Sequence, residues 1–139
     1  MIGTTEEMIK REESVLNKRL PISFKNWLLK NNGTGIGGIS IFPVKDENNI
    51  KKTWESISSY FTQQWASDIA VFEDEDGMDF SHLLPFGYGN ADYYCFDYSE
   101  NDTDPSIVIW FHENGETEYR AANFIEFEQK ALQEDYDND

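Results

Sequence analysis

The stretch "PFGYGNADYYCFDYS", residues 85–99, decides how this chain folds, because it combines a glycine pair with a dense aromatic run. It holds the only cysteine and four of the seven tyrosines. Aromatic residues fit a pleated sheet, so residues 92–98 are predicted to form a strand. Alternation along a strand gives two faces: Tyr93, Cys95 and Asp97 on one, and Asp92, Tyr94, Phe96 and Tyr98 on the other. We expect one face to pack on helices and the other to reach solvent.

The glycines of Gly87-Tyr88-Gly89 precede this strand. A phosphate-binding loop needs a helix N-terminus directly after its glycines, whereas here a strand with acidic residues follows. The triplet is therefore interpreted as a turn at positive φ that leads into the strand.

Apolar periodicity on both sides of this stretch predicts alternating helices and strands. Helical spacing indicates helices over 5–16, 20–32, 48–61 and 121–132, the first of them opened by a Thr4–Glu7 capping box. Short apolar or alternating runs indicate strands over 37–44, 68–73, 83–86, 92–98, 106–112 and 116–120, with an acidic turn at 74–77 and an Asn114-Gly115 hairpin.

This order of elements predicts an α+β fold. The chain is expected to form a single domain over residues 1–139, in which a largely antiparallel or mixed β-sheet packs against N-terminal, middle and C-terminal helices. The run 106–112 is apolar on both faces, so it should be a central strand. The acidic tail 133–139 is expected to fray.

Charge is unevenly distributed along the chain, whose net charge is −16. Residues 1–52 carry nine Lys or Arg against six Asp or Glu, whereas residues 53–139 carry two against twenty-one. A field of this sign repels nucleic acid and anionic membranes and attracts basic proteins. The alternative explanation is that the excess of acidic residues serves only to keep the protein soluble. The N-terminus lacks the apolar run of a signal peptide or membrane span, so we expect a cytoplasmic protein.

Enzyme chemistry finds little support in these residues. A nucleophilic Cys95 needs a lowered thiol pKa, and the neighbouring Asp92 and Asp97 would raise it. The preferred interpretation is a packed thiol, and a hydrolase that uses Cys95 is the alternative. His82 and His112 could approach Cys95 in space, but no spacing requires it.

Metal chemistry is equally unsupported. One cysteine and two histidines cannot form a structural zinc cluster. The acidic run 73–79 is no calcium loop, because Phe72 and Leu83 would occupy the first and last ligand positions. No catalytic, cofactor or metal site is therefore predicted.

What remains is an acidic and aromatic surface suited to protein binding. Tyrosine is enriched at binding hot spots, and neighbouring acids steer a basic partner. Ordinary sheet packing is the alternative for any one tyrosine. The candidate contacts are Asp74, Glu75, Asp76, Asp79, Tyr88, Tyr93, Asp97 and Tyr98.

Four motifs in order over most of residues 9–132 resemble the SUKH superfamily. They are the Leu-Pro, aromatic, Leu and Asn-Gly pattern of 20–33, the aromatic Cys-Phe-Asp strand of 92–97, the Trp-bearing strand of 104–113, and the closing helix of 121–132. Three positions depart from the family pattern: Ile107 stands in place of valine, Ala91 where glycine is usual before the aspartate, and Asn123 where serine is common.

The resemblance implies an α+β fold and a non-enzymatic function. Bacterial members look like immunity proteins, or antitoxins, that bind a cognate toxin and block its active site. The expected partner is thus a basic toxin domain, with a nuclease fitting the charge best, and the protein itself is expected to be a monomer or weak homodimer. A regulatory scaffold like the fungal cell-wall synthesis regulator of the same fold is the alternative.

Overall fold

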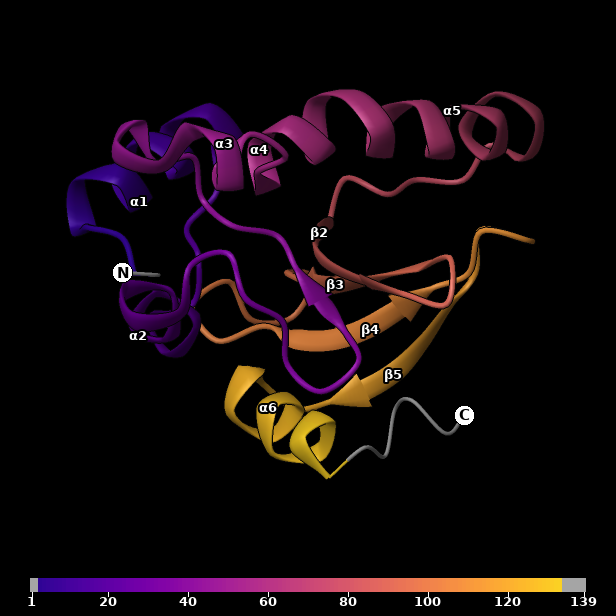
Figure 1. Ribbon diagram of the computed structural model, residues 1–139. Helices are drawn as coiled ribbons and strands as arrows, with labels where there is room; N and C mark the ends of the chain where they lie inside the picture. The colour runs from indigo at the N-terminus through magenta and orange to yellow at the C-terminus, as the bar shows by residue number, and fades with distance from the viewer. Residues whose placement is uncertain (1–2, 134–139) are drawn as a thin grey trace.

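Five antiparallel strands form one sheet between two layers of helices in the computed structural model, which describes residues 3–133 (Figure 1). The strands are β1 (Ser40–Ile41), β2 (Leu83–Gly89), β3 (Asp92–Asp97), β4 (Ser106–Trp110) and β5 (Thr117–Ala121), and they lie in this order across the sheet. The helices are α1 (Glu6–Leu16), α2 (Ile22–Asn31), α3 (Ile50–Thr53), α4 (Ile57–Ser59), α5 (Trp65–Asp76) and α6 (Phe124–Leu132). A 3₁₀ turn, η1 (Glu47–Asn49), precedes α3, and a π-helical segment, η2 (Tyr60–Gln64), joins α4 to α5. The expected α+β fold is confirmed.

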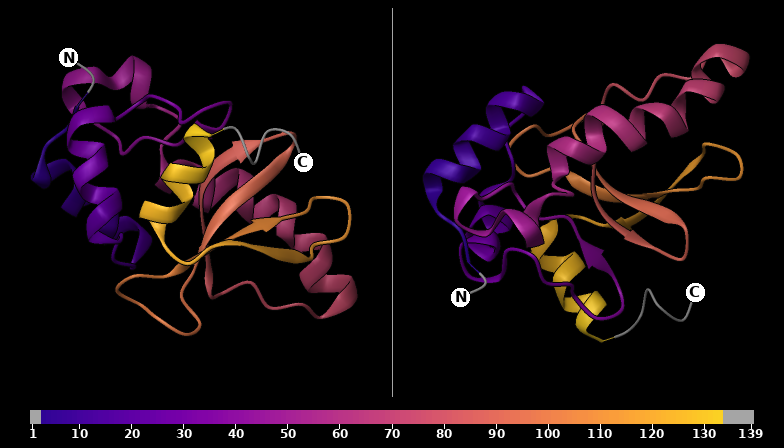
Figure 2. Two further views of the ribbon diagram at one scale, coloured as in Figure 1. Left: turned by 90° about the horizontal axis from the view of Figure 1, so that it is seen from below. Right: turned by 45° about the horizontal axis from the view of Figure 1, so that its top comes forward.

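Helices cover both faces of the sheet. Helix α5 crosses one face, and α6 lies on the other beside α2 (Figure 1). Seen from below, α6 stands in front of the strands and α5 behind them (Figure 2). Strand β4 pairs with β3 and β5, which agrees with its prediction as an internal strand.

Phenylalanines form the core under α2 and α6. Phe86 of β2 and Phe96 of β3 stack with ring centroids 4.2 Å apart, and both contact Phe124 of α6. Phe24 of α2 meets Phe124 at 4.9 Å. All four side chains are at most 1% exposed, so this face of the sheet is closed to solvent.

Tryptophans pack the opposite face against α5. Trp65 of α5 lies 5.1 Å from Trp110 of β4 and 5.3 Å from Tyr93 of β3, measured between ring centroids. Tyr93 and Tyr94, which point to opposite faces of β3, are 2% and 3% exposed. The expectation that one face of this strand reaches solvent is therefore wrong, because helices cover both.

The predicted strand over 68–73 is helical instead and belongs to α5. Its four consecutive apolar residues, Ile69 to Phe72, resemble a short buried strand. Trp65, Ile69 and Phe72, however, follow the spacing of one helical face, and all three pack toward the core. The predicted acidic turn at 74–77 is accordingly the last turn of α5 and its C-cap, Gly77, which has a φ of 63°.

The single helix predicted over 48–61 is broken into pieces. The chain leaves α3 at Trp54 and restarts at Ser56, whose Oγ accepts a hydrogen bond from the Ser59 N–H at 3.3 Å. Ile50 and Trp54, expected on the buried stripe, are therefore exposed, while Ile57 is fully buried. An N-cap serine that can restart a helix inside the apolar repeat explains the difference.

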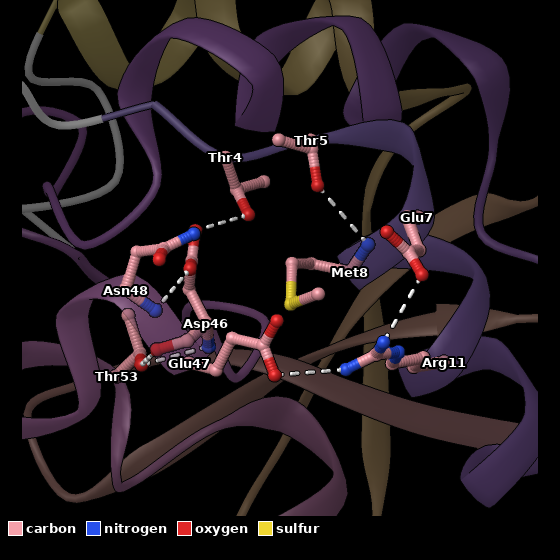
Figure 3. A network of polar contacts seen from close by, with 9 residues as sticks. All are labelled: Thr4, Thr5, Glu7, Met8, Arg11, Asp46, Glu47, Asn48 and Thr53. Carbon is pink, nitrogen blue, oxygen red and sulfur yellow. Dashed lines mark hydrogen bonds and ion pairs between the residues drawn. The ribbon is translucent and has the colours of Figure 1, made fainter.

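Thr5, and not Thr4, is the N-cap of α1. Its hydroxyl oxygen accepts from the Met8 N–H at 3.3 Å, while the Thr4 hydroxyl donates to Asp46 at 2.8 Å (Figure 3). Glu7, expected to close a capping box, pairs with Arg11 at 3.0 Å. These contacts tie the start of α1 to the segment before α3.

The turn between β2 and β3 lies at Asn90 and Ala91, whose φ values are 54° and 72°. The predicted turn over 87–89 is wrong, because Gly87 and Gly89 pair with β3 within β2. Gly87 follows an irregularity in the register of these strands, where a residue without a side chain fits closely against Ser40. Of the predicted frayed tail, the structure describes only Gln133, the C-cap of α6.

Replacing Ala91 with glycine is expected to raise the free energy of unfolding by about 0.5–1 kcal/mol, since the left-handed conformation costs an L-residue about 1–2 kcal/mol. Urea denaturation measures the change. The matched control is Ala66→Gly on the exposed side of α5, which should lower the same free energy by about 1 kcal/mol. Loss of stability in both variants would contradict the assignment of strain to Ala91.

Candidate binding site: an acidic and aromatic cleft

A cleft of about 620 Å³ opens between the η2–α5 segment and the sheet. One wall is formed by residues of η2 and α5: Tyr60, Gln64, Asp68, Val71 and Phe72. The other is formed by residues of the strands and their connections: Tyr88, Ala91, Tyr93, Trp110 and His112. We call this hollow the aromatic cleft.

Asp68 is held in place inside the aromatic cleft by two donors. The Tyr93 hydroxyl donates to its Oδ2 at 2.7 Å, and the Gln64 amide donates to its Oδ1 at 3.0 Å. Burial, followed by the hydrogen bond to Asp68, raises the pKa of Tyr93 well above its usual value. The phenol therefore remains a donor to the Asp68 carboxylate.

His112 and Asp92 form a pair at the edge of the cleft. The His112 Nδ1 lies 2.7 Å from Asp92 Oδ1, which also accepts the His112 backbone N–H at 3.0 Å. The hydrogen bond to Asp92 raises the pKa of His112 above its ordinary value of 6.5. When the imidazole is protonated, the two side chains neutralise each other.

Two features mark the aromatic cleft as more than a packing gap. Trp110 is 1% exposed, and its indole N–H has no hydrogen-bond partner among the described residues 3–133. A buried donor without a partner costs free energy. The wall at Tyr60 and Gln64 is π-helical, and such segments are frequent at functional sites.

An acidic rim borders the cleft where α5 ends beside the β4–β5 hairpin. The two meet at Phe72 and Gly115, where a Cβ on the glycine would lie 2.9 Å from the ring. The acidic rim consists of exposed carboxylates on these two elements: Glu73, Asp74, Glu75, Asp76, Glu113 and Glu116. No Lys or Arg occurs over residues 53–119, so nothing within this segment offsets their charge.

The sequence-predicted contacts fall into two groups. Asp74, Glu75 and Asp76 lie on the acidic rim, and Tyr88 and Tyr93 line the cleft. Tyr88 is 40% exposed, whereas Tyr93 is 2% exposed.

The other three predicted contacts lie apart from the cleft lining. Asp79 follows α5, and its carboxylate accepts the Ser81 N–H at 2.9 Å, which lowers its pKa. Asp97 is at the opposite end of β3 from the cleft. Tyr98 follows it, and its hydroxyl donates to the Arg19 carbonyl at 2.7 Å.

Sequence reasoning missed the roles of Asp68, Gln64, Trp110 and His112 in this cleft. The helical spacing of Trp65 and Ile69 was the available signal, because it places Asp68 one turn after Gln64. The other contacts join different elements: Tyr93 to Asp68, and His112 to Asp92. No local pattern in the sequence encodes them.

Cys95 is fully buried in β3. Burial, and to a smaller extent Asp97, raises the pKa of its thiol, so the reactive thiolate is disfavoured. Within residues 3–133, no group of three or more His, Cys, Asp or Glu side chains is arranged to hold a metal ion. In the same part of the chain, each helix is too short or too polar to cross a lipid bilayer.

Comparison with curated proteins gave no match. The sequence model of the SMI1 / KNR4 family (SUKH-1), by contrast, matches residues 3–130, nearly the whole described chain. The SUKH resemblance inferred from the four motifs is thereby confirmed, and it supports an immunity-like or regulatory function in general terms. The chain belongs to the SMI1 / KNR4 family (SUKH-1).

Proposed function

We propose that this protein is an immunity protein that neutralises a cognate toxin domain by stoichiometric binding and without catalysis. Family membership supports a function of this general type. The acidic rim beside an aromatic cleft supplies the surface, since aromatic anchors provide binding energy and charges provide steering.

The observation that carries the proposal is the absence of Lys and Arg over residues 53–119, which contain fifteen Asp or Glu. This segment includes α5, the β2–β3 turn, the β4–β5 connection and all ten residues that line the cleft. A nuclease must present a basic cleft to its substrate, because phosphate contacts dominate nucleic-acid affinity. A nuclease domain is therefore the toxin that complements this surface best.

The carboxylates of the acidic rim would occupy the positions of substrate phosphates. A rim that protrudes at the end of α5 can enter a basic cleft, and its long-range field accelerates the encounter. The bound immunity protein then excludes nucleic acid from the toxin, and no bond is made or broken.

The triple variant Asp74→Asn, Glu75→Gln and Asp76→Asn is expected to slow association with the toxin encoded beside this gene about tenfold at low salt, because steering depends on charge. Surface plasmon resonance over a range of salt concentrations measures the rate constants. The association rate constant of the native protein should also fall as the salt concentration rises, and that of the variant should fall less steeply.

The matched control removes the same charge from the β3–β4 loop through Glu100→Gln, Asp102→Asn and Asp104→Asn, and its association rate should stay close to native. If the native protein neither binds that neighbour nor protects cells from it, the immunity proposal is wrong. A gene that stands alone, whose product binds a cellular protein without inhibiting it, would favour the regulatory scaffold.

A further inference from the structure

We infer that the aromatic cleft receives an arginine side chain of the basic partner, with Asp68 as its counter-ion. The inference rests on the proposed function for the identity of the partner, and it assigns to the cleft a ligand chemistry of its own. Two properties of the cleft carry it: its charge and its aromatic walls.

Asp68 supplies a negative charge to which no cationic side chain of residues 3–133 is hydrogen-bonded. Among residues 3–133, its carboxylate is bonded only to the neutral Tyr93 hydroxyl and Gln64 amide, one on each oxygen. Each oxygen therefore keeps a lone pair, and a guanidinium can bind both oxygens in a bidentate arrangement. The other acid at the cleft, Asp92, is paired with His112 and offers no such excess charge.

Tyrosine rings beside Asp68 fit a planar cation. Tyr60, Tyr88 and Tyr93 line the cleft from three different elements. The Tyr88 and Tyr93 rings are 5.7 Å apart at 72°, while Tyr60 is fixed by stacking on Phe42 at 3.8 Å. A guanidinium stacks on aromatic faces and is less strongly hydrated than an ammonium, so this lining favours arginine over lysine.

Trp110 also lines the cleft, so the resonance of its indole N–H, which has no acceptor among the described residues, can report what binds there. A volume of about 620 Å³ is in the range of small-molecule sites and leaves room for peptide on either side of the arginine.

The test titrates the full-length, ¹⁵N-labelled protein with the blocked tripeptide acetyl-Gly-Arg-Gly-amide and follows the indole N–H resonances by NMR. The Trp110 resonance is expected to shift saturably, and those of Trp27 and Trp54, which lie outside the cleft, to stay in place. The isosteric citrulline peptide, which lacks the charge, should leave Trp110 unchanged. The inference is overturned if the Trp110 resonance does not shift with the arginine peptide. It is also overturned if the citrulline peptide, or the same peptide with lysine in place of arginine, shifts this resonance equally.

Asp68→Asn tests the counter-ion and keeps an oxygen that can accept from Tyr93. It should weaken arginine-peptide binding about tenfold or more, because a charge-assisted pair is lost. Asp102→Asn, which removes the same charge from the loop at the other end of β3, should bind as the native protein does. Thermal melting of both variants verifies that each is folded. Equal binding by the two variants overturns the role of Asp68.

The same variant separates this inference from the proposed function. If the toxin binds Asp68→Asn with native affinity, the arginine inference fails and the immunity function stands. If the native cleft takes up the arginine peptide in a charge-dependent way but the protein binds no toxin, the immunity function fails and the inference about the cleft stands.

Discussion

Replacing Phe96 with alanine is expected to lower the free energy of unfolding by about 4 kcal/mol, the largest effect foreseen for one side chain. Phe96 has no exposed surface, and its ring meets Phe24, Phe86 and Phe124 from three other elements. Without the ring, the protein loses the free energy gained by moving it from water into the core. The neighbouring rings fill the resulting cavity only in part, which lowers the stability further.

Urea denaturation followed by tryptophan fluorescence measures this loss. The matched control is Ile125→Ala, since Ile125 follows Phe124 on α6 but is 54% exposed, and its truncation should cost about 0.5 kcal/mol. A change below about 1.5 kcal/mol for Phe96→Ala would contradict the packing described for this side of the sheet.

Glu12→Ala is expected to lower the free energy of unfolding by about 3 kcal/mol. Glu12 is 3% exposed, and its carboxylate accepts the Ser58 N–H at 2.8 Å and the Lys45 N–H at 3.4 Å. Without it, the buried Ser58 N–H loses its acceptor, at about 1–3 kcal/mol, and the more exposed Lys45 N–H loses a weaker bond. Because Ser58 lies in α4, which continues through η2 into α5, Glu12 also anchors the wall of the aromatic cleft.

Two further variants sharpen this prediction, again by urea denaturation. Glu12→Gln keeps one oxygen as an acceptor and should cost less than Glu12→Ala. Glu7→Ala on the same helix breaks only an exposed ion pair with Arg11 and should cost about 0.5 kcal/mol or less. Equal losses for Glu12→Ala and Glu7→Ala would mean that the buried contacts contribute nothing.

Local pattern predicted those parts of the fold whose burial matches their own periodicity. Phe24 and Leu28 of α2, and Phe124 and Phe127 of α6, are buried as their helical spacing indicates. The last two strands and the hairpin that joins them were also predicted. Their connection is longer than the two-residue turn typical of Asn-Gly, because the Phe111 N–H donates to the Glu116 carbonyl and only Gly115 of that pair has a positive φ.

Prediction failed where a short window fits two periods or where a non-glycine residue takes a glycine conformation. The apolar run from Ile69 to Phe72 is short enough for a buried strand, and only the packing of Trp65 on the sheet shows that this segment is a helix. The turn was expected at Gly87 and Gly89 but lies at Asn90 and Ala91, both at positive φ. The pairing of β2 with β3 up to Gly89 and Asp92 requires a tight turn at that place.

The sequence by itself determined the α+β class, the SUKH family and the concentration of negative charge after residue 52, since these follow from composition and local pattern. The tertiary structure alone decided which side chains meet. Asp68 reaches Tyr93 over 25 residues, and Asp92 reaches His112 over 20. Such contacts depend on strand register and on where α5 crosses the sheet, which only the packing of the whole chain fixes. The stretch 85–99 therefore serves as the buried centre of the sheet, and only its turn end opens on the cleft.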